Sequence, residues 1–286
     1  MEIMKRNKKG TFLSINPNSK IFEMIKIQQP KWWNLFFKDD DLYIEIRKDN
    51  YINVYYYGGS LAKIEYLDNF VASTHQKYLG HKIPLRKKSN VKGAFIYELL
   101  DLETLDKIKI SEIKNRIKND YLQKINAEKP AEKWIQGKLI KENQNYIDSE
   151  FQFNQDQDIG KLRIDLVELS NNILSFIELK GIFDNRLIND EKRNQKTPEI
   201  IEQMYKYKLF IHKYEENIIE YYQKLIEIKN SLGLTSIDKT KIRLNKNPKL
   251  IIANTYNKKT KKRDERICDI ENLLKKNDID YKIIKL

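Results

Sequence analysis

The pattern of apolar and polar positions changes along the chain, and its first part predicts an antiparallel sheet. Short alternating runs rich in Ile, Val and Tyr cover four stretches, residues 41–47, 51–57, 60–67 and 70–79. Asp49-Asn50 and Gly58-Gly59 separate the first three runs, and both pairs favour tight hairpin turns. The pattern therefore predicts a meander of three or four strands, and 93–100 reads as one more strand or the start of a helix.

Two later stretches repeat their apolar side chains at helical intervals, with charged side chains on the opposite face. Residues 102–127 predict one or two helices, and residues 199–233 predict a long helical region that is broken near 212–216. Thr197 followed by Pro198 favours a helix start with Thr197 as the N-cap. The chain therefore mixes strands and helices in both halves.

An aromatic cluster near the N-terminus admits two interpretations. Trp32, Trp33, Phe36 and Phe37 follow a short predicted helix that ends before Pro30. Aromatic side chains stack on nucleic-acid bases, but they also fill small cores or cover a sheet. The structural interpretation is favoured, because large aromatic side chains are usually well buried.

Residues 161–181 carry the pattern that bears most directly on function. Two apolar runs with the length of buried strands flank a polar turn at 170–172. Asp165 interrupts the first run, and Glu178 and Lys180 interrupt the second. Burying an unpaired charge is costly and alternate residues of a strand share a face, so these side chains should lie together. Two carboxylates beside an ammonium suit a hard divalent cation with a lysine next to it.

The elements predicted around this hairpin form a complete unit. A helix over 130–143 and a strand over 146–155 precede the hairpin. After the long helical region come a strand over 248–256, a helix over 266–276 and a strand over 280–286. The sequence predicts a mixed α/β (α+β) chain in three parts, a β-rich N-terminal module (1–100), a helical connector (101–127) and a C-terminal unit (128–286).

The hairpin also carries a recognisable spacing. Asp165 is followed after twelve residues by Glu178-Leu179-Lys180, which resembles the D…(D/E)xK signature of the PD-(D/E)xK nuclease superfamily. The resemblance extends over 128–286 and implies a restriction-endonuclease-like αβββαβ core. Only this ExK triplet has a strand–turn–strand context. Two further triplets fall in stretches of helical periodicity, 112–114 and 227–229.

The resemblance implies a magnesium site in which Mn²⁺ would substitute for Mg²⁺. Asp165, Glu178 and the backbone carbonyl of Leu179 would hold the metal. Lys180 would orient or deprotonate the attacking water, or stabilise the transition state. Ile164 stands where the signature has Pro, a departure that removes no ligand. The competing interpretation is a structural network of buried ion pairs, although such networks often cost more stability than they contribute.

The two helices that flank the three strands add further candidates. The superfamily often carries an acidic residue on the first helix, and Glu132 matches that position as a further metal ligand, with Glu128 and Glu142 as competitors. Gln203 and Tyr207 resemble the QxxxY motif of RecB-like nucleases, and their spacing of four places both on one helix face as catalytic candidates. An ordinary amphipathic helix in a Tyr-rich chain explains this pair equally well.

The charge balance favours a polyanionic partner. The chain has 54 Lys and Arg against 41 Asp and Glu, a net charge of +13, which favours nucleic acid over an acidic membrane surface. A coding bias toward Lys, Ile and Asn is the competing explanation. A basic segment within a loop predicted at 256–263 would contact phosphates or else lie in solvent. Its members are Lys258, Lys259, Lys261, Lys262 and Arg263.

Cysteine content and apolar run length suggest the compartment. The single cysteine, Cys268, excludes an internal disulfide and is typical of a reducing cytosol. Residues 1–12 are basic but lack the apolar core of a signal peptide, and no run approaches the length of a membrane span. We therefore expect a soluble cytoplasmic protein without membrane contact.

These observations together predict a metal-dependent nuclease, a DNA endonuclease of restriction, phage defence or repair. Two alternatives stay open, a catalytically inactive nucleic-acid-binding protein on the same scaffold and an RNA nuclease. The N-terminal module contains no candidate catalytic cluster, so we expect it to select the nucleic acid or to bind a protein partner. Association into a homodimer also stays open.

Overall fold

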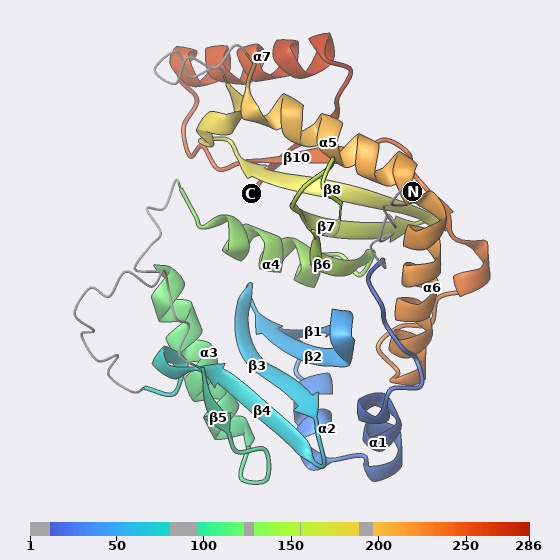
Figure 1. The fold of residues 1–286 in the computed structure, drawn as a ribbon. Helices are drawn as coiled ribbons and strands as arrows, with labels where there is room; N and C mark the ends of the chain where they lie inside the picture. The colour runs from blue at the N-terminus through green and yellow to red at the C-terminus, as the bar shows by residue number, and fades with distance from the viewer. Residues whose placement is uncertain (1–11, 81–96, 123–128, 155, 189–196) are drawn as a thin grey trace, which may run out of the picture.

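The structure is a computed structural model that describes residues 12–80, 97–122, 129–154, 156–188 and 197–286. The chain has the mixed α+β class that the sequence predicts, with two sheets (Figure 1). Helix α4 (Glu132–Glu142) lies between the two sheets in this view. Among the described residues, no helix is both long enough and apolar enough to cross a membrane.

Five antiparallel strands form the first sheet, in the order β1-β2-β3-β4-β5. Their bounds are β1 Leu42–Arg47, β2 Tyr51–Tyr56, β3 Gly59–Tyr66, β4 Phe70–His75 and β5 Tyr97–Leu100. The predicted meander is confirmed, and β5 decides between the alternatives for 93–100 in favour of a strand, with 93–96 outside the described residues. Asp49 and Asn50 take φ values of 66° and 59°, which the turn after β1 requires.

Three helices pack against the first sheet. They are α1 (Lys20–Gln28), α2 (Lys31–Phe37) and α3 (Lys107–Leu122). The described part of the connector thus contains a single helix. Trp32, Trp33 and Phe36 of α2 are buried, which confirms the structural interpretation of the aromatic cluster, whereas Phe37 is partly exposed.

The second sheet has the order β11-β10-β8-β7-β6, with β9 paired to β8. Its strands are β6 Tyr146–Phe153, β7 Leu162–Ser170, β8 Ile173–Gly181, β9 Arg243–Leu244, β10 Lys249–Asn254 and β11 Asp280–Lys285. β6, β7 and β8 are antiparallel neighbours, whereas β10 runs parallel to both β8 and β11. Parallel neighbours need crossover connections, and helices supply them here. The element order predicted for the C-terminal unit is therefore confirmed.

The crossover between β8 and β10 contains two helices, α5 (Glu199–Lys213) and α6 (Glu215–Ser231). They meet at Tyr214, where the helical region was predicted to break, and Gly233 follows with a φ of 75°. The predicted N-cap is wrong by one residue. Pro198, rather than Thr197, occupies the N-cap, because Pro198 itself is extended (φ −57°, ψ 139°) and helical backbone begins only after it.

The crossover between β10 and β11 is helix α7 (Lys261–Lys276), which begins five residues earlier than predicted. The Thr260 hydroxyl accepts a hydrogen bond from the Arg263 N–H and caps the helix. Lys261, Lys262 and Arg263 of the basic segment therefore lie in the first helical turn. Their expected position in a loop is wrong. Charged side chains without apolar periodicity gave no helical pattern, although Thr260 caps a helix there.

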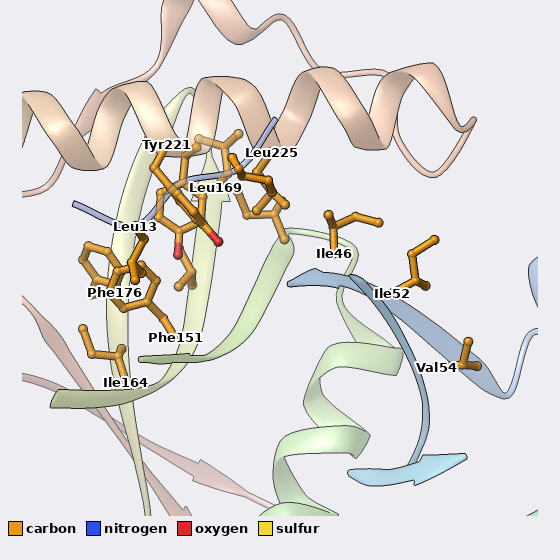
Figure 2. Packing of buried hydrophobic residues seen from close by; sticks show 14 of the residues in the cluster. Leu13, Ile46, Ile52, Val54, Phe151, Ile164, Leu169, Phe176, Tyr221 and Leu225 are labelled. Atoms are coloured by element: carbon orange, nitrogen blue, oxygen red, sulfur yellow. The ribbon is translucent and has the colours of Figure 1, made fainter. Parts of the chain in front are cut away.

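In the described part of the chain, the larger of two hydrophobic clusters extends through both sheets, and a smaller one lies around Ile135, Leu179 and Ile251. Ile46 and Ile52 of the first sheet belong to the same buried cluster as Phe151 and Phe176 of the second, and Tyr221 of α6 joins them (Figure 2). The expected N-terminal module and C-terminal unit therefore both contribute to the larger cluster.

Buried charges also link the two sheets. Arg47 of β1 lies 3.2 Å from Asp148 of β6, whose other oxygen accepts a 2.9 Å hydrogen bond from Tyr222 of α6. Glu45 of β1 pairs at 3.2 Å with Lys229 of α6. Each charged group has a partner from the other half of the chain, and removal of either half would leave its partners buried and unpaired.

Close backbone contact fixes α4 against the turn between β2 and β3. A Cβ at Gly137 would lie 2.5 Å from the Tyr57 Cα, and a Cβ at Gly58 would lie 2.3 Å from the Lys133 carbonyl oxygen. Only glycine permits this approach, and Gly58 also needs its φ of 79°. Because α4 carries Glu132, the first sheet helps to position a helix of the candidate site.

Candidate active site

The β7–β8 hairpin places three charged side chains in the interior. Asn171 and Asn172 form its turn with φ values of 51° and 62°, a left-handed conformation that Asn tolerates better than most residues. The antiparallel register then brings Asp165 to the level of Glu178 on the neighbouring strand. Asp165 is 6% exposed, Glu178 2% and Lys180 1%. Charges at such depth need partners.

The Lys180 ammonium lies among three carboxylates. It forms an ion pair with Glu178 and lies 3.9 Å from both Asp165 Oδ2 and Glu132 Oε2. It also donates a 3.0 Å hydrogen bond to the carbonyl oxygen of Leu179. The structure therefore brings together the three charged residues that the sequence predicted, the predicted backbone carbonyl and the predicted acidic residue of the preceding helix.

The other acidic candidates near α4 do not join this cluster in the described structure. Glu142 lies in the last turn of α4 and pairs with Lys138 at 3.9 Å. Glu128 lies outside the described residues. Glu132 is therefore the acidic side chain of α4 that reaches Lys180.

The predicted QxxxY pair bonds directly to the cluster. Gln203 Nε2 donates to Glu178 Oε1 at 2.7 Å and to the Tyr207 hydroxyl at 2.7 Å. The Tyr207 oxygen lies 2.7 Å from Glu178 Oε2 and 2.5 Å from the Arg163 carbonyl oxygen. A phenol carries one proton, so Tyr207 donates it to the ionised Glu178. When Glu178 is protonated, its own proton can bond Tyr207, and Tyr207 then donates to the Arg163 carbonyl oxygen. Both oxygens of Glu178 are thus held from α5.

Burial shifts the acid strength of this cluster. Burial, with the negative charge of Asp165 adding to it, raises the pKa of Glu178 to about 7, although Lys180 opposes the shift. Burial also raises the pKa of Asp165 and of Glu132, again against the effect of Lys180. Near neutral pH, Glu178 therefore exchanges a proton easily, a property that acid–base and metal-binding sites share.

The oxygen donors of the cluster suit a hard cation such as Mg²⁺, which takes few protein ligands and keeps several waters. Asp165 and Glu178 offer carboxylates and Leu179 offers a carbonyl. The buried amide oxygen of Gln203 has no hydrogen-bond partner among the described residues. Across those same residues, no three His, Cys, Asp or Glu side chains gather as a ready-made metal site, and the Lys180 ammonium lies where the carboxylates meet. A metal bound here would take the two carboxylates and the carbonyl oxygen, and the Lys180 ammonium would have to leave the space between them.

Two polar residues that the sequence analysis missed support the cluster. Gln136 of α4 is buried and donates a 2.5 Å hydrogen bond to the carbonyl oxygen of Asp165. Arg186 lies 3.7 Å from Glu132 and 2.6 Å from Asp184. A polar residue one helical turn after Glu132, inside an apolar stretch, was the available signal for Gln136. Nothing in the local pattern identifies Arg186.

The basic segment follows β10 at the same edge of the sheet as Lys180. β10 lies parallel to β8 with Ala253 opposite Gly181, so the carboxyl ends of the two strands are adjacent. The four lysines of the basic segment are exposed, whereas Arg263 is half-buried above the Tyr256 ring at 4.7 Å. Positive charge therefore lies at the edge of the sheet where β8 carries Lys180.

Comparison of the chain with models of protein families, with curated proteins and with solved structures found no match. The site is therefore interpreted from the geometry and chemistry of its own side chains.

Proposed function

We propose that this protein is a metal-dependent nuclease that hydrolyses phosphodiester bonds of DNA. One observation carries the proposal. Asp165, Glu178 and Lys180 meet in the interior from two adjacent strands, and Gln203 and Tyr207 bond directly to Glu178. Buried charges seldom stabilise a fold by themselves, and groups with perturbed pKa values concentrate at functional sites. Restriction, phage defence and DNA repair are processes that need this activity.

The order of elements supports a restriction-endonuclease-like PD-(D/E)xK core. Helix α4 is followed by the antiparallel strands β6, β7 and β8, by α5, and then by β10 parallel to β8. This is the αβββαβ order that the resemblance implies, with α6 as a second crossover helix and α7 and β11 appended. The proposed metal ligands lie on its two central strands and its first helix.

Each side chain of the cluster has a role in this proposal. A bound Mg²⁺ would polarise the scissile phosphate and acidify a water. Asp165, Glu178 and the carbonyl oxygen of Leu179 would hold the metal, with Glu132 nearby. Lys180 would turn from Glu178 toward the attacking water or a phosphate oxygen, because a compact ammonium on a flexible stem binds phosphate as a point charge.

Gln203 and Tyr207 would act as positioning residues. They contact both oxygens of Glu178 and would hold this carboxylate in one orientation. The proton that Glu178 carries near neutral pH would leave as a metal binds, since a coordinating carboxylate must be ionised. Metal affinity would then increase as the pH rises through about 7.

Cleavage of plasmid DNA with Mg²⁺ or Mn²⁺ tests the proposal. Asp165→Asn keeps an acceptor for the Leu179 N–H, which Asp165 Oδ2 now accepts at 2.9 Å, but removes the charge. We expect this variant to lose roughly 100-fold or more of the rate, because metal binding is worth several kcal/mol in the transition state. Glu112→Gln is the matched control, since Glu112 begins another ExK triplet on the exposed face of α3. Wild-type cleavage by Asp165→Asn refutes the assignment.

A catalytically inactive nucleic-acid-binding protein is the second candidate, and one observation favours it. The Lys180 ammonium already neutralises the carboxylates that a metal would need. Binding of DNA without cleavage in either metal would support this candidate. Transfer RNA offered in parallel separates a third possibility, an RNA nuclease, because only that enzyme would cut tRNA and spare the plasmid.

A further inference from the structure

A cavity of about 730 Å³ is lined by residues that follow the carboxyl ends of β8 and β10. Phe183 and Asn185 of the segment after β8 form one wall, and Tyr256 of the loop after β10 forms another. Lys262 of the first turn of α7 and Lys129 before α4 complete it. The volume falls in the range of pockets that hold small organic ligands.

The lining of the cavity combines aromatic rings with cations. The rings of Phe183 and Tyr256 are 4.7 Å apart and nearly perpendicular. The Lys129 ammonium lies 4.9 Å from the centre of the Phe183 ring, and the Arg263 guanidinium lies 4.7 Å from that of Tyr256. Aromatic rings beside cations are the pairing with which proteins hold unpaired nucleotides, since the ring stacks on the base and the cation attracts the phosphate.

The charge of the cavity is net positive. Four cationic side chains line it against two acidic ones, Glu265 and Asp269. One of the four, Arg266, donates hydrogen bonds to the carbonyl oxygens of Ile182 and Asp184, at 2.9 Å and 3.0 Å. These bonds hold the segment that carries Phe183 against α7. The distance between the Phe183 ring and the cationic side chains of α7 is therefore maintained.

We propose that this cavity holds one unpaired nucleotide of the DNA strand next to the phosphate that is cut. Its base would lie against Phe183 and its phosphate would contact Lys129 and Lys262. This inference rests on the proposed function. Phe183 comes three residues after Lys180, in a turn that follows β8, so their backbones lie at most about 10 Å apart. One DNA strand can therefore contact both places. A base inside a duplex cannot enter the cavity, and DNA with an unpaired segment is therefore the substrate class that fits.

Binding by the full chain without divalent metal tests this inference. The probes are a single-stranded oligonucleotide of about eight nucleotides, in the range of known single-strand sites, and an abasic strand of the same length. Phe183→Ala should weaken binding of the oligonucleotide by roughly five- to 100-fold and leave the abasic strand unaffected, because it removes base stacking alone. Phe183→Leu keeps the apolar volume and should give the same loss in a folded protein.

Lys262→Gln tests the phosphate contact. It should weaken binding of both strands and lower the salt dependence, the slope of log affinity against log salt, by about 0.7. Two controls carry the same chemical changes outside the cavity, Tyr205→Ala on an exposed ring of α5 and Lys275→Gln in the last turn of α7. Tyr205→Ala should leave the ratio of the two affinities unchanged, and Lys275→Gln should leave the salt dependence unchanged.

Equal affinity of the wild-type protein for the two strands overturns the inference, as does an effect of Phe183→Ala no larger than that of Tyr205→Ala. The measurement needs no cleavage. A protein that prefers the base-containing strand through Phe183 but cuts no DNA would refute the proposed nuclease and leave the nucleotide site in place. A protein that cuts DNA but shows no preference for the base-containing strand would support the nuclease and refute the nucleotide site.

Discussion

Replacement of Lys180 by Met offers the sharpest test of the acidic cluster. The change removes an ammonium that is 1% exposed and leaves Glu178 and Asp165, which are nearly as buried, without their cation. Removal of one partner from a buried ion pair destabilises proteins by roughly 3–5 kcal/mol. At about 2–4 °C per kcal/mol for a large domain, the thermal midpoint should fall by on the order of 10 °C at pH 8.

The loss should depend on pH. Burial raises the pKa of Glu178 above its usual value of 4.5 to about 7, so this group stabilises the folded state below pH 4.5, and that contribution disappears as the pH rises through about 7. Lys180 is one of the groups that lower this pKa, and Lys180→Met should raise it further. At pH 5 Glu178 is protonated and needs no cation, and the deficit should be smaller than at pH 8.

Added Mg²⁺ should restore stability if the carboxylates can hold a metal. At a concentration 100 times its dissociation constant, a ligand adds about 2.7 kcal/mol, which is more than half of the expected deficit. Lys229→Met is the matched control. It also removes a buried ammonium from a glutamate, Glu45, but Arg47 remains 3.2 Å from Asp148 there and disfavours a metal.

Thermal unfolding of both variants at pH 5 and pH 8, with and without Mg²⁺, supplies the measurement. The expected result is a deficit in both variants at pH 8 and recovery by Mg²⁺ in Lys180→Met alone. A Lys180→Met protein as stable as the wild type at pH 8 would refute the electrostatic reasoning. Equal recovery of the two variants would refute the metal site.

Three further predictions concern Tyr207, the basic segment and the contact between the two halves of the chain. Tyr207→Phe removes a hydrogen bond that lowers the pKa of Glu178, so the pH profile of Mg²⁺-dependent cleavage should move to higher pH, whereas Tyr205→Phe on the exposed face of α5 should leave it unchanged. Neutralising the basic segment should reduce the salt dependence of DNA binding, and an unchanged slope would mean that the segment is only solvated. Residues 128–286 alone should unfold at a lower temperature than the full chain, because Asp148 and Lys229 lose their partners; an equal midpoint would contradict the shared core.

Much of the secondary structure and the centre of the candidate site were predictable from the sequence. Strand alternation and turn residues carry local information, and the hairpin over 161–181 formed as predicted. Charges inside apolar runs predicted that Asp165, Glu178 and Lys180 would meet, because the short turn predicted at 170–172 leaves few registers. A four-residue spacing placed Gln203 and Tyr207 on one face. These features depend on neighbours close in sequence.

Local signals were weaker at the helix ends. The start of α7 was missed because Lys261, Lys262 and Arg263 have no apolar periodicity, and the only cue was Thr260 as a cap. The sequence also did not predict which residue the Gln203–Tyr207 pair contacts. Helical spacing shows that the two side chains share a face, but it does not show which strand that face packs against. The structure shows that this face meets Glu178.

Only the tertiary structure decided how the two sheets combine. The pairing of Arg47 with Asp148 joins residues about a hundred positions apart, and the cavity brings together side chains from 129 to 273. Hydrophobic periodicity shows which face of an element is buried, but it contains no information on which other face covers it. That choice depends on the shapes and charges of distant segments once the chain has collapsed, as in the contact of α4 with the β2–β3 turn, which two glycines permit.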